Sequence, residues 1–145
     1  QGQIVISGSQ EALAKAMKLA KAKGGRRAIP LEVSGPFHSS RMRRAIRGLA
    51  RILSALHLRA PRVPVVANTT ARPLKSAGAL RKELERQLCH CVQWQRSVEF
   101  MSRSGVATFV EIGPGDVLSG LIKRISKNAE TMHIGDVRSI QGMNH

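Results

Sequence analysis

A strand that turns directly into a helix constrains this fold more than any other feature of the sequence. Residues 107–112 have continuous apolar character, which is typical of a strand in a sheet covered on both faces. Gly113-Pro114-Gly115 supplies a turn, and we predict a helix from Asp116 to about Ser126 after it. A last short strand is predicted near residues 132–134, before a polar tail. Strands that alternate with helices in this way indicate the α/β class.

The N-terminal third is predicted to be a compact β-α-β segment. β-Branched residues between glycines indicate the first strand, and apolar residues on one face indicate the helix. Ser9 is the expected N-cap of that helix, and Gly24-Gly25 is its expected end. Pro30 interrupts the second strand, which is therefore short or lies at an edge. The three elements are expected at residues 3–7, 10–23 and 27–33.

Helical periodicity and turn residues also predict the middle of the chain. We expect a helix at residues 40–56, a strand at 63–67, a loop at 68–73, and helices at 76–88 and 93–104. Ser76 is the expected N-cap of the second of these helices. Only two or three of the strands belong to the α/β sheet. A sheet this narrow leaves open edges and uncovered apolar faces, so we expect that part of the fold is missing.

The composition is that of a globular but strongly basic chain. The 145 residues are 42% apolar and carry a formal net charge of +15, with 24 Lys and Arg against 9 Asp and Glu. Such a charge attracts anions, but aromatic residues make up only 3% of the chain, which argues against single-strand nucleic-acid binding. The densest basic set is interpreted as the solvated face of one helix: Arg41, Arg43, Arg44, Arg47 and Arg51.

Targeting signals and metal motifs are absent from the sequence. No apolar run is long enough for a transmembrane helix, and no signal peptide is visible. The chain lacks an initiator Met, so we expect Gln1 to be an internal residue of a longer chain. Cys89 and Cys91 flank His90, but no second pair of ligands follows at zinc spacing. They are interpreted as reduced thiols of a cytoplasmic protein.

Catalytic chemistry is suggested by the stretch Gly35-Pro36-Phe37-His38-Ser39. A histidine just after a short apolar strand is the kind of residue that serves a serine acyltransferase as general base. The sequence contains no Gly-x-Ser-x-Gly, the motif that presents a nucleophilic serine on a strained turn. The base is therefore present without its nucleophile, as in the C-terminal half of an acyl-transfer enzyme.

The chain resembles the malonyl-CoA:acyl carrier protein transacylases over nearly its whole length. The resemblance is specific because many short matches occur in order and at the spacing of the family. The matching residues are 2–8, 27–31, 33–39, 64–71, 86–88, 92–94, 97–99, 109–115 and 117–121.

This resemblance implies an α/β fold, namely the C-terminal part of an α/β-hydrolase-like acyltransferase domain plus part of its small ferredoxin-like subdomain. Residues 1–34 would be the second half of the ferredoxin-like subdomain, and residues 35–145 would belong to the large domain. The family's nucleophilic serine, its malonyl-binding arginine and its oxyanion-hole amides match no residue here.

The resemblance also implies roles for three residues. His38 would be the catalytic base that takes the serine proton and returns it to the leaving thiol. The main-chain carbonyl of Gln87 would accept a hydrogen bond from the His38 ring and orient it. Phe37 would contact substrate and crowd out α-methylated acyl groups. Each residue also has a purely structural alternative. His38 could be a hydrogen-bonded histidine beside a helix start, Gln87 a polar residue at a helix C-terminus, and Phe37 a packing residue.

We therefore expect part of an enzyme that moves malonyl from CoA to the phosphopantetheine thiol of acyl carrier protein, inactive alone. Its expected partners are acyl carrier protein, malonyl-CoA and the missing N-terminal half of the same enzyme, with no metal, other cofactor, nucleic acid or membrane. The alternatives are a non-catalytic module that binds acyl carrier protein or a complementary half, and, less favoured, a basic nucleic-acid binder.

Overall fold

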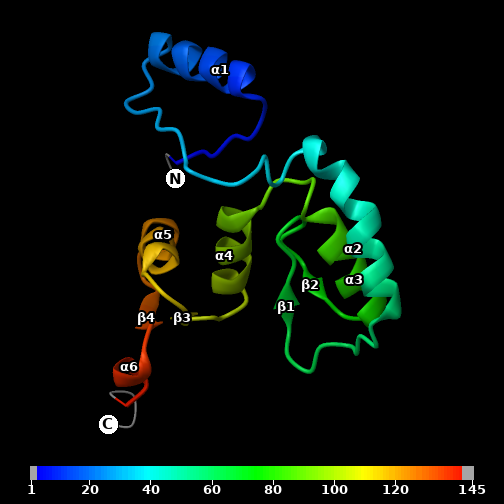
Figure 1. Cartoon of the computed structure of the whole chain (residues 1–145). Coiled ribbons are helices and arrows are strands. Elements are labelled where there is room, and N and C mark those ends of the chain that lie inside the picture. Colours follow the sequence, from blue (N-terminus) through cyan, green and yellow to red (C-terminus); the bar gives the residue numbers. More distant parts are fainter. Residues whose placement is uncertain (1–2, 142–145) are drawn as a thin grey trace. The chain divides into compact units, whose positions relative to one another are not determined.

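The computed structural model describes residues 3–141 and divides into two compact units (Figure 1). Of the described residues, the N-terminal unit contains 3–69 and 73–92, and the C-terminal unit contains 70–72 and 93–141. The predicted boundary at residue 34 is a different division of the chain and stays a prediction.

The first helix of the N-terminal unit begins and ends where its capping residues predict. α1 spans Gln10–Ala22, and the Ser9 hydroxyl accepts a hydrogen bond from the Ala12 amide at 3.3 Å. Gly24 has a φ of 85°, the left-handed conformation that ends many helices, and the Gly25 amide donates to the Ala20 carbonyl. Local sequence is therefore sufficient to define this helix.

The two strands predicted on either side of α1 are not formed, so the β-α-β prediction is wrong for this segment. The described residues before Gln10 and those from Arg27 to Val33 carry no strand assignment. Ile4, Ile29 and Val33 are 88%, 68% and 65% exposed. An extended segment becomes a strand only when a neighbour accepts its main-chain hydrogen bonds, and neither segment has such a neighbour in the described part of the chain.

Two helices and a hairpin form the rest of the N-terminal unit. The helix predicted at 40–56 is present as a 3₁₀ turn, Ser40–Met42, followed by α2, Arg43–Ala55. β1 (Val65–Val66) and β2 (Pro73–Leu74) pair antiparallel, so the predicted loop ends one residue earlier than expected. α3 spans Ala77–Arg86, and Ser76 caps it as predicted, its hydroxyl accepting from the Ala79 amide at 3.1 Å.

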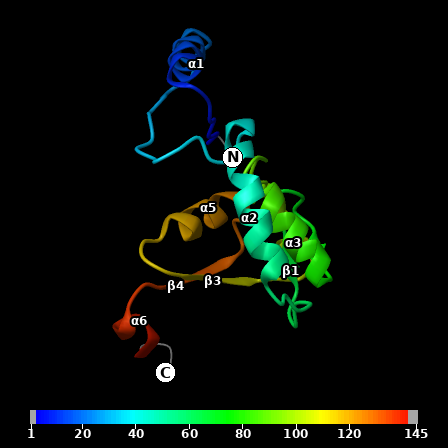
Figure 2. The same cartoon turned by 45° about the vertical axis from the view of Figure 1, so that its right-hand side comes forward.

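α2 and α3 lie side by side in both views (Figure 2). The Arg81 side chain joins the two helices. The Arg81 guanidinium donates to the carbonyls of Leu53 and Leu56 at 3.1 and 3.2 Å. These carbonyls lie at the C-terminal end of α2, where the regular i to i+4 donors run out. They also accept from the Leu56 and Leu58 amides, at 3.3 and 3.1 Å. A cation on α3 therefore caps α2 and also favours the negative end of its dipole.

The C-terminal unit contains the strand, turn and helix that the sequence predicts at residues 107–126. α4 (Trp94–Arg103) leads into β3 (Thr108–Ile112), α5 (Val117–Ile125) and β4 (Glu130–Ile134). β3 and β4 pair in parallel from Thr108 opposite Glu130 to Ile112 opposite Ile134. Val98, Phe109 and Ile122 form the buried core between α4, β3 and α5. The predicted helix and strands of this unit are confirmed.

One face of the β3–β4 pair is open, contrary to the expectation that β3 is covered on both faces. Phe109 is buried, whereas Val110 and Ile112, on the alternate face, are 45% and 79% exposed. Met132, directly opposite Val110, is 40% exposed. Within the described residues α4 and α5 supply one layer of cover, which reaches only the face that carries Phe109.

The predicted polar tail contains a further helix, α6, Val137–Gln141. Asp136 and Ser139 start it, because the Ser139 amide donates to the Asp136 carboxylate at 2.8 Å and the Ser139 hydroxyl accepts from the Asp136 amide at 3.0 Å. Within residues 3–141, none of the helices has the length and apolar character needed to cross a membrane.

Candidate active site

His38 lies in a tight, strained turn that leads directly into the helical segment. The Phe37 amide donates to the Gly35 carbonyl at 2.9 Å, and the Ser39 hydroxyl donates to the Pro36 carbonyl at 2.7 Å. His38 itself has a φ of 60°, a left-handed conformation that is costly for a residue with a Cβ. Strained residues of this kind cluster at functional sites, which makes His38 a candidate on geometry as well as on sequence.

The imidazole of His38 contacts the main chain of Gln87, 49 positions further along. His38 Nδ1 lies 2.6 Å from the Gln87 carbonyl oxygen. A carbonyl oxygen only accepts, so Nδ1 is the protonated nitrogen and a neutral ring keeps its lone pair at Nε2. The structure therefore brings together two residues that the resemblance singled out, with Nε2 left as the nitrogen able to take up a proton.

The end of α3 explains why this carbonyl is available. Gln87 is the C-cap of α3, and its amide donates to the Glu83 carbonyl at 2.9 Å. Carbonyls in the last turn of a helix have no donor within the helix. The preceding carbonyl, of Arg86, accepts from the amides of Cys89 and His90. The Gln87 carbonyl accepts from His38 instead.

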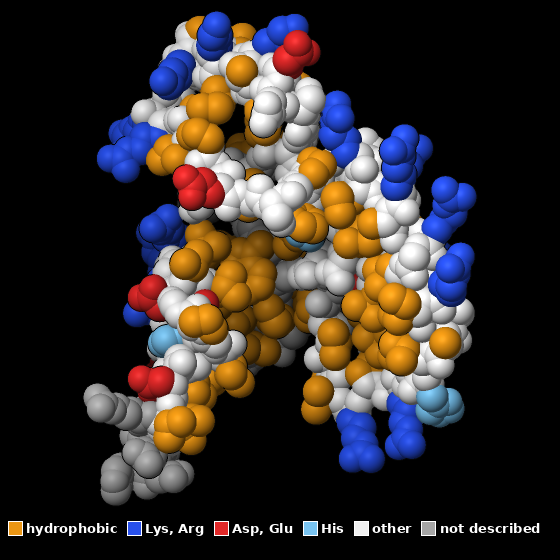
Figure 3. Space-filling view, in the orientation of Figure 1, with side chains coloured by type: hydrophobic (Ala, Val, Ile, Leu, Met, Phe, Trp, Pro, Cys, Tyr) orange, Lys and Arg blue, Asp and Glu red, His pale blue; other side chains and the backbone are white. Residues whose placement is uncertain are grey.

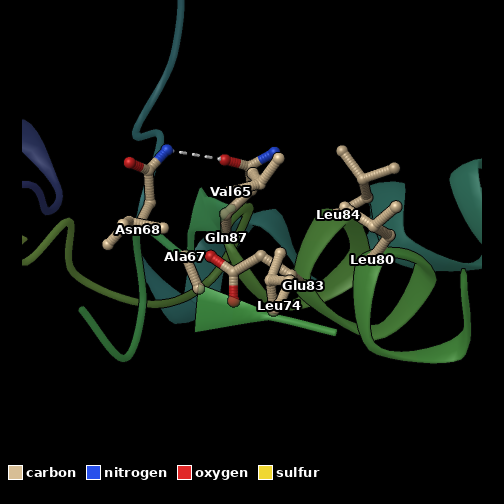
Figure 4. Close-up of a pocket in the computed structure, with 9 residues that line it drawn as sticks. Val65, Ala67, Asn68, Leu74, Leu80, Glu83, Leu84 and Gln87 are labelled. Atoms are coloured by element: carbon tan, nitrogen blue, oxygen red, sulfur yellow. Dashed lines mark hydrogen bonds between the residues drawn. The ribbon is translucent and has the colours of Figure 1, made fainter. Parts of the chain in front are cut away.

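Side-chain bonds also join the end of α3 to the loop after β1 (Figure 4). The Asn68 amide nitrogen donates to Gln87 Oε1 at 3.1 Å. The Glu83 carboxylate accepts from the Thr69 amide at 2.8 Å and from the Thr69 hydroxyl at 2.6 Å. Sequence reasoning treated Asn68 as structural and missed Glu83 and Thr69. An acidic residue four positions before Gln87, on the same helix face, was the available signal.

Asn68, Glu83 and Gln87 line a small pocket of about 180 Å³. Its walls are mostly apolar, with Val65, Leu74 and Leu84 among them, and Glu83 and Asn68 supply polar atoms. His38 and Phe37 do not line it. Phe37 is 41% exposed, and its ring lies 3.8 Å from the position that a Cβ on Gly35 would take. Its predicted contact with substrate stays a prediction.

The Gly113-Pro114-Gly115 turn does not leave an open anion site at the start of α5. The Glu111 carboxylate accepts from the amides of Leu118 and Ser119 at 3.1 and 2.7 Å. The Ser119 side chain, then the amides of Ser119 and Leu118 and the nearby His133 hold the pKa of Glu111 below its ordinary value, against a smaller opposing effect of burial. A carboxylate of the chain thus occupies the position an anion would take.

Neither cysteine belongs to a cluster of metal ligands. Cys89 is half-buried and Cys91 is exposed, and both are free thiols. In the described part of the chain, no three His, Cys, Asp or Glu side chains lie close enough together to hold a metal ion.

Comparison with known proteins identifies the family of this chain. The acyl transferase domain family matches residues 1–140. This chain belongs to the acyl transferase family. Among curated relatives, the malonyl CoA-acyl carrier protein transacylase of Bacillus subtilis is 41% identical over 140 residues, which are 97% of this chain and 44% of that protein. The Salmonella typhimurium protein of the same name is 47% identical over 124 residues, 86% of this chain and 40% of its own length.

Solved structures place this acyl transferase chain in the same fold. An acyl carrier protein S-malonyltransferase from Vibrio cholerae superposes with a TM-score of 0.88 at 39% identity, covering 94% of this chain and 44% of that one. A malonyl-transacylase solved in complex with its type II polyketide acyl-carrier protein gives 0.89 at 39% identity, covering 95% and 45%. The acyl transferase chain thus spans less than half the length of the relatives it matches.

Proposed function

We propose that this chain is the C-terminal part of an enzyme that transfers malonyl from CoA to the phosphopantetheine thiol of acyl carrier protein. The observation that carries the proposal is the 2.6 Å contact between His38 Nδ1 and the Gln87 carbonyl oxygen. It assigns the basic lone pair of the neutral ring to Nε2 and uses no carboxylate to do so. The proposed acyl group, malonyl, and the proposed donor and acceptor, CoA and acyl carrier protein, are taken from the names of the relatives.

In the proposed mechanism His38 moves one proton in each half-reaction. Nε2 takes the proton of a serine hydroxyl, supplied by the part of the relatives that this chain does not match, while the serine oxygen attacks the malonyl thioester carbon. The imidazolium then returns the proton to the CoA sulfur as the thioester bond breaks. The carrier thiol reverses these steps and releases the serine. The Gln87 carbonyl holds the ring in one tautomer throughout, the task that a carboxylate has in other triads.

The remaining assignments belong to the same proposal. Residues 1–34 form part of the ferredoxin-like subdomain and residues 35–145 part of the large domain. Phe37 lies beside the acyl group and favours malonyl over α-methylated acyl groups. Because one methyl group changes binding in an apolar site by only about 1–3 kcal/mol, this selectivity is partial.

A grafted enzyme tests the role of His38. Residues 1–140 replace the matched segment of the Bacillus subtilis transacylase, and transfer of labelled malonyl from malonyl-CoA to holo acyl carrier protein is measured. We expect the graft to be active and its His38→Ala variant to lose about 10⁴-fold in rate. His57→Ala is the matched control, since His57 is an exposed histidine of the same unit. A graft that keeps its rate without the His38 imidazole would disprove the assignment.

The 145 residues alone are proposed to be inactive, because they contain no Gly-x-Ser-x-Gly from which a nucleophilic serine could act. Oxyanion donors of the family are also unmatched, and losing one such donor already costs about 10²–10³-fold in rate. The purified chain is assayed under the same conditions as the graft. Transfer by the chain at a rate near that of the graft would contradict this part of the proposal.

A non-catalytic binding module is the second candidate, favoured by the basic face of α2. Arg43, Arg44, Arg47 and Arg51 are exposed, α2 contains no acidic residue, and Figure 3 shows Lys and Arg side chains in a row along it. Acyl carrier proteins are acidic, so such a face suits them electrostatically. Titration of the chain against holo carrier protein at low and high salt, together with the graft assay, separates the candidates. Binding that weakens with salt, in a chain whose graft transfers no malonyl, favours the module.

A further inference from the structure

We propose that Glu83 and Thr69 form a clamp that positions the Gln87 carbonyl and, through it, the tautomer of His38. The inference rests on the proposed role of His38 and deepens it. Glu83 and Thr69 are positioning residues, since neither contacts His38 in the structure. The clamp consists of the two hydrogen bonds from the Thr69 amide and hydroxyl to the Glu83 carboxylate.

The first argument is the burial of a carboxylate that has no cation. Glu83 is only 8% exposed and lines the apolar pocket beside Leu74 and Leu84. Its two oxygens accept from two groups of one residue, the Thr69 amide and the Thr69 hydroxyl, and no Lys or Arg pairs with it among the described residues. Burying a charge is costly unless hydrogen bonds replace water. An apolar side chain would fill this pocket at lower cost, so the acid serves the bonds that it makes.

The second argument is that the clamp and the His38 contact share one helical turn. Glu83 and Gln87 are successive residues on one face of α3, joined by the bond from the Gln87 amide to the Glu83 carbonyl. The adjacent loop residues, Asn68 and Thr69, bond the side chains of these same two residues in register. Figure 4 shows the Asn68–Gln87 bond and the Glu83 side chain one turn away. Two such ties fix the last turn of α3 against the loop.

The consequence for His38 follows from the geometry of a single hydrogen bond. The ring is exposed, and Gln87 is its hydrogen-bond partner, through Nδ1. If the last turn of α3 frays, as helix ends do when nothing holds them, the carbonyl moves and the ring is free to rotate or change tautomer. Catalytic groups must be held within about 0.5 Å of their working position, which a free helix end does not ensure.

Isosteric substitutions test the clamp in the full chain, with the ¹⁵N spectrum of the His38 ring as readout. That spectrum distinguishes the Nδ1–H tautomer from the Nε2–H tautomer and needs no catalytic activity. Thr69→Val removes the hydroxyl bond and Thr69→Ser keeps it. Glu83→Leu removes both bonds, whereas in Glu83→Gln the amide oxygen and nitrogen satisfy the same two Thr69 groups. Thr70→Val is the matched control at the exposed neighbouring position.

We expect the Nδ1–H tautomer in the wild type, in Thr69→Ser, in Glu83→Gln and in Thr70→Val, and a mixture of tautomers in Thr69→Val and Glu83→Leu. Thr69→Val changes no volume, so it decides the question if Glu83→Leu fails to fold. An unchanged His38 spectrum in folded Thr69→Val would overturn the clamp. In the grafted enzyme the same variant should lower kcat by up to about 100-fold, with KM little changed.

The two proposals fail separately in these experiments. A wild-type chain whose His38 ring is not Nδ1-protonated would contradict the orientation on which the proposed mechanism depends. The opposite failure is also possible. If Thr69→Val changes the His38 tautomer while the His38→Ala graft stays active, the clamp is supported and the catalytic role of His38 is contradicted. If Glu83→Gln shows the same mixture of His38 tautomers as Glu83→Leu, the hydrogen bonds to Thr69 do not hold the tautomer, and the clamp is overturned.

Discussion

At the scale of single residues, the histidine turn combines strain with one strong contact. His38 has a left-handed backbone with a φ of 60°, and it makes a 2.6 Å bond through its ring. The left-handed conformation costs a residue with a Cβ roughly 1–2 kcal/mol. This conformation lowers the stability of the protein but directs the His38 ring toward the Gln87 carbonyl. Backbone strain of this kind is expected at functional residues.

Paired substitutions at His38 separate the strain from the bond. His38→Ala and His38→Gly both lose the contact with Gln87, but only glycine relieves the left-handed backbone. We therefore expect the glycine variant to have the larger free energy of unfolding, by about 1 kcal/mol. Urea denaturation of the two variants measures the difference. Equal midpoints would show that position 38 is not strained in solution.

Gln87 should tolerate loss of its side chain, because its contribution to the site comes from the main chain. Gln87→Ala keeps the carbonyl that accepts from His38 and removes only the bond from Asn68. We expect a loss of about 1 kcal/mol in the free energy of unfolding. The Nδ1–H tautomer should be unchanged, because the two Glu83–Thr69 bonds still hold the last turn of α3. Chemical denaturation and the His38 ¹⁵N spectrum test this. A change of tautomer would instead assign the Gln87 side chain a direct part in holding the ring.

At the scale of elements, helices begin where a side chain supplies the missing hydrogen bonds. Ser9 and Ser76 do this for α1 and α3, and both positions were predictable from the sequence. α5 uses Glu111, which lies outside the helix and reaches its first amides across the glycine-rich turn. The caps within four residues were found from local sequence, whereas the Glu111 cap depends on how β3 and α5 meet.

The Glu111 cap makes the stability of the C-terminal unit depend on pH. Its hydrogen bonds hold the pKa of Glu111 below the ordinary value of 4.5 in the folded state. The unfolded state therefore binds a proton first as the pH falls, so the stabilisation is present above pH 4.5 and is lost as the pH falls through the lowered pKa. We expect the unfolding free energy of the wild type to fall more steeply below this pH than that of Glu111→Gln. Denaturation series between neutral and acidic pH give both slopes, and parallel slopes would contradict the expectation.

At the scale of the whole molecule, an uncovered sheet face is the main departure from an ordinary domain. Val110, Ile112 and Met132 share the open face of the β3–β4 pair. The relatives are more than twice as long as the segment that matches this chain. Apolar faces of this kind are normally covered, and uncovered ones bind other apolar surfaces.

Covering this face should stabilise the chain. We expect the chain to bind an apolar dye such as ANS, and Ile112→Thr to reduce the signal. Adding the part of the Bacillus subtilis transacylase that this chain does not match should displace the dye and raise the melting temperature. Binding at 100 times Kd corresponds to about 2.7 kcal/mol. No displacement by that part would contradict the proposal that it completes the fold.

Local sequence was enough to predict the helices from α1 to α5, the Ser9 and Ser76 caps and the strand-turn-helix of residues 107–126. Short motifs in order along the chain supplied the resemblance that singled out His38 and Gln87. These depend on neighbours within a few positions, or on short motifs in order along the chain. Tertiary contacts settled which extended segments became strands. Residues 27–33 have strand character but no strand partner within residues 3–141, whereas β1 pairs with the short β2. The tertiary structure also decided the Glu83–Thr69 clamp, because hydrogen bonds between residues 14 positions apart depend on how a loop and a helix end meet in space.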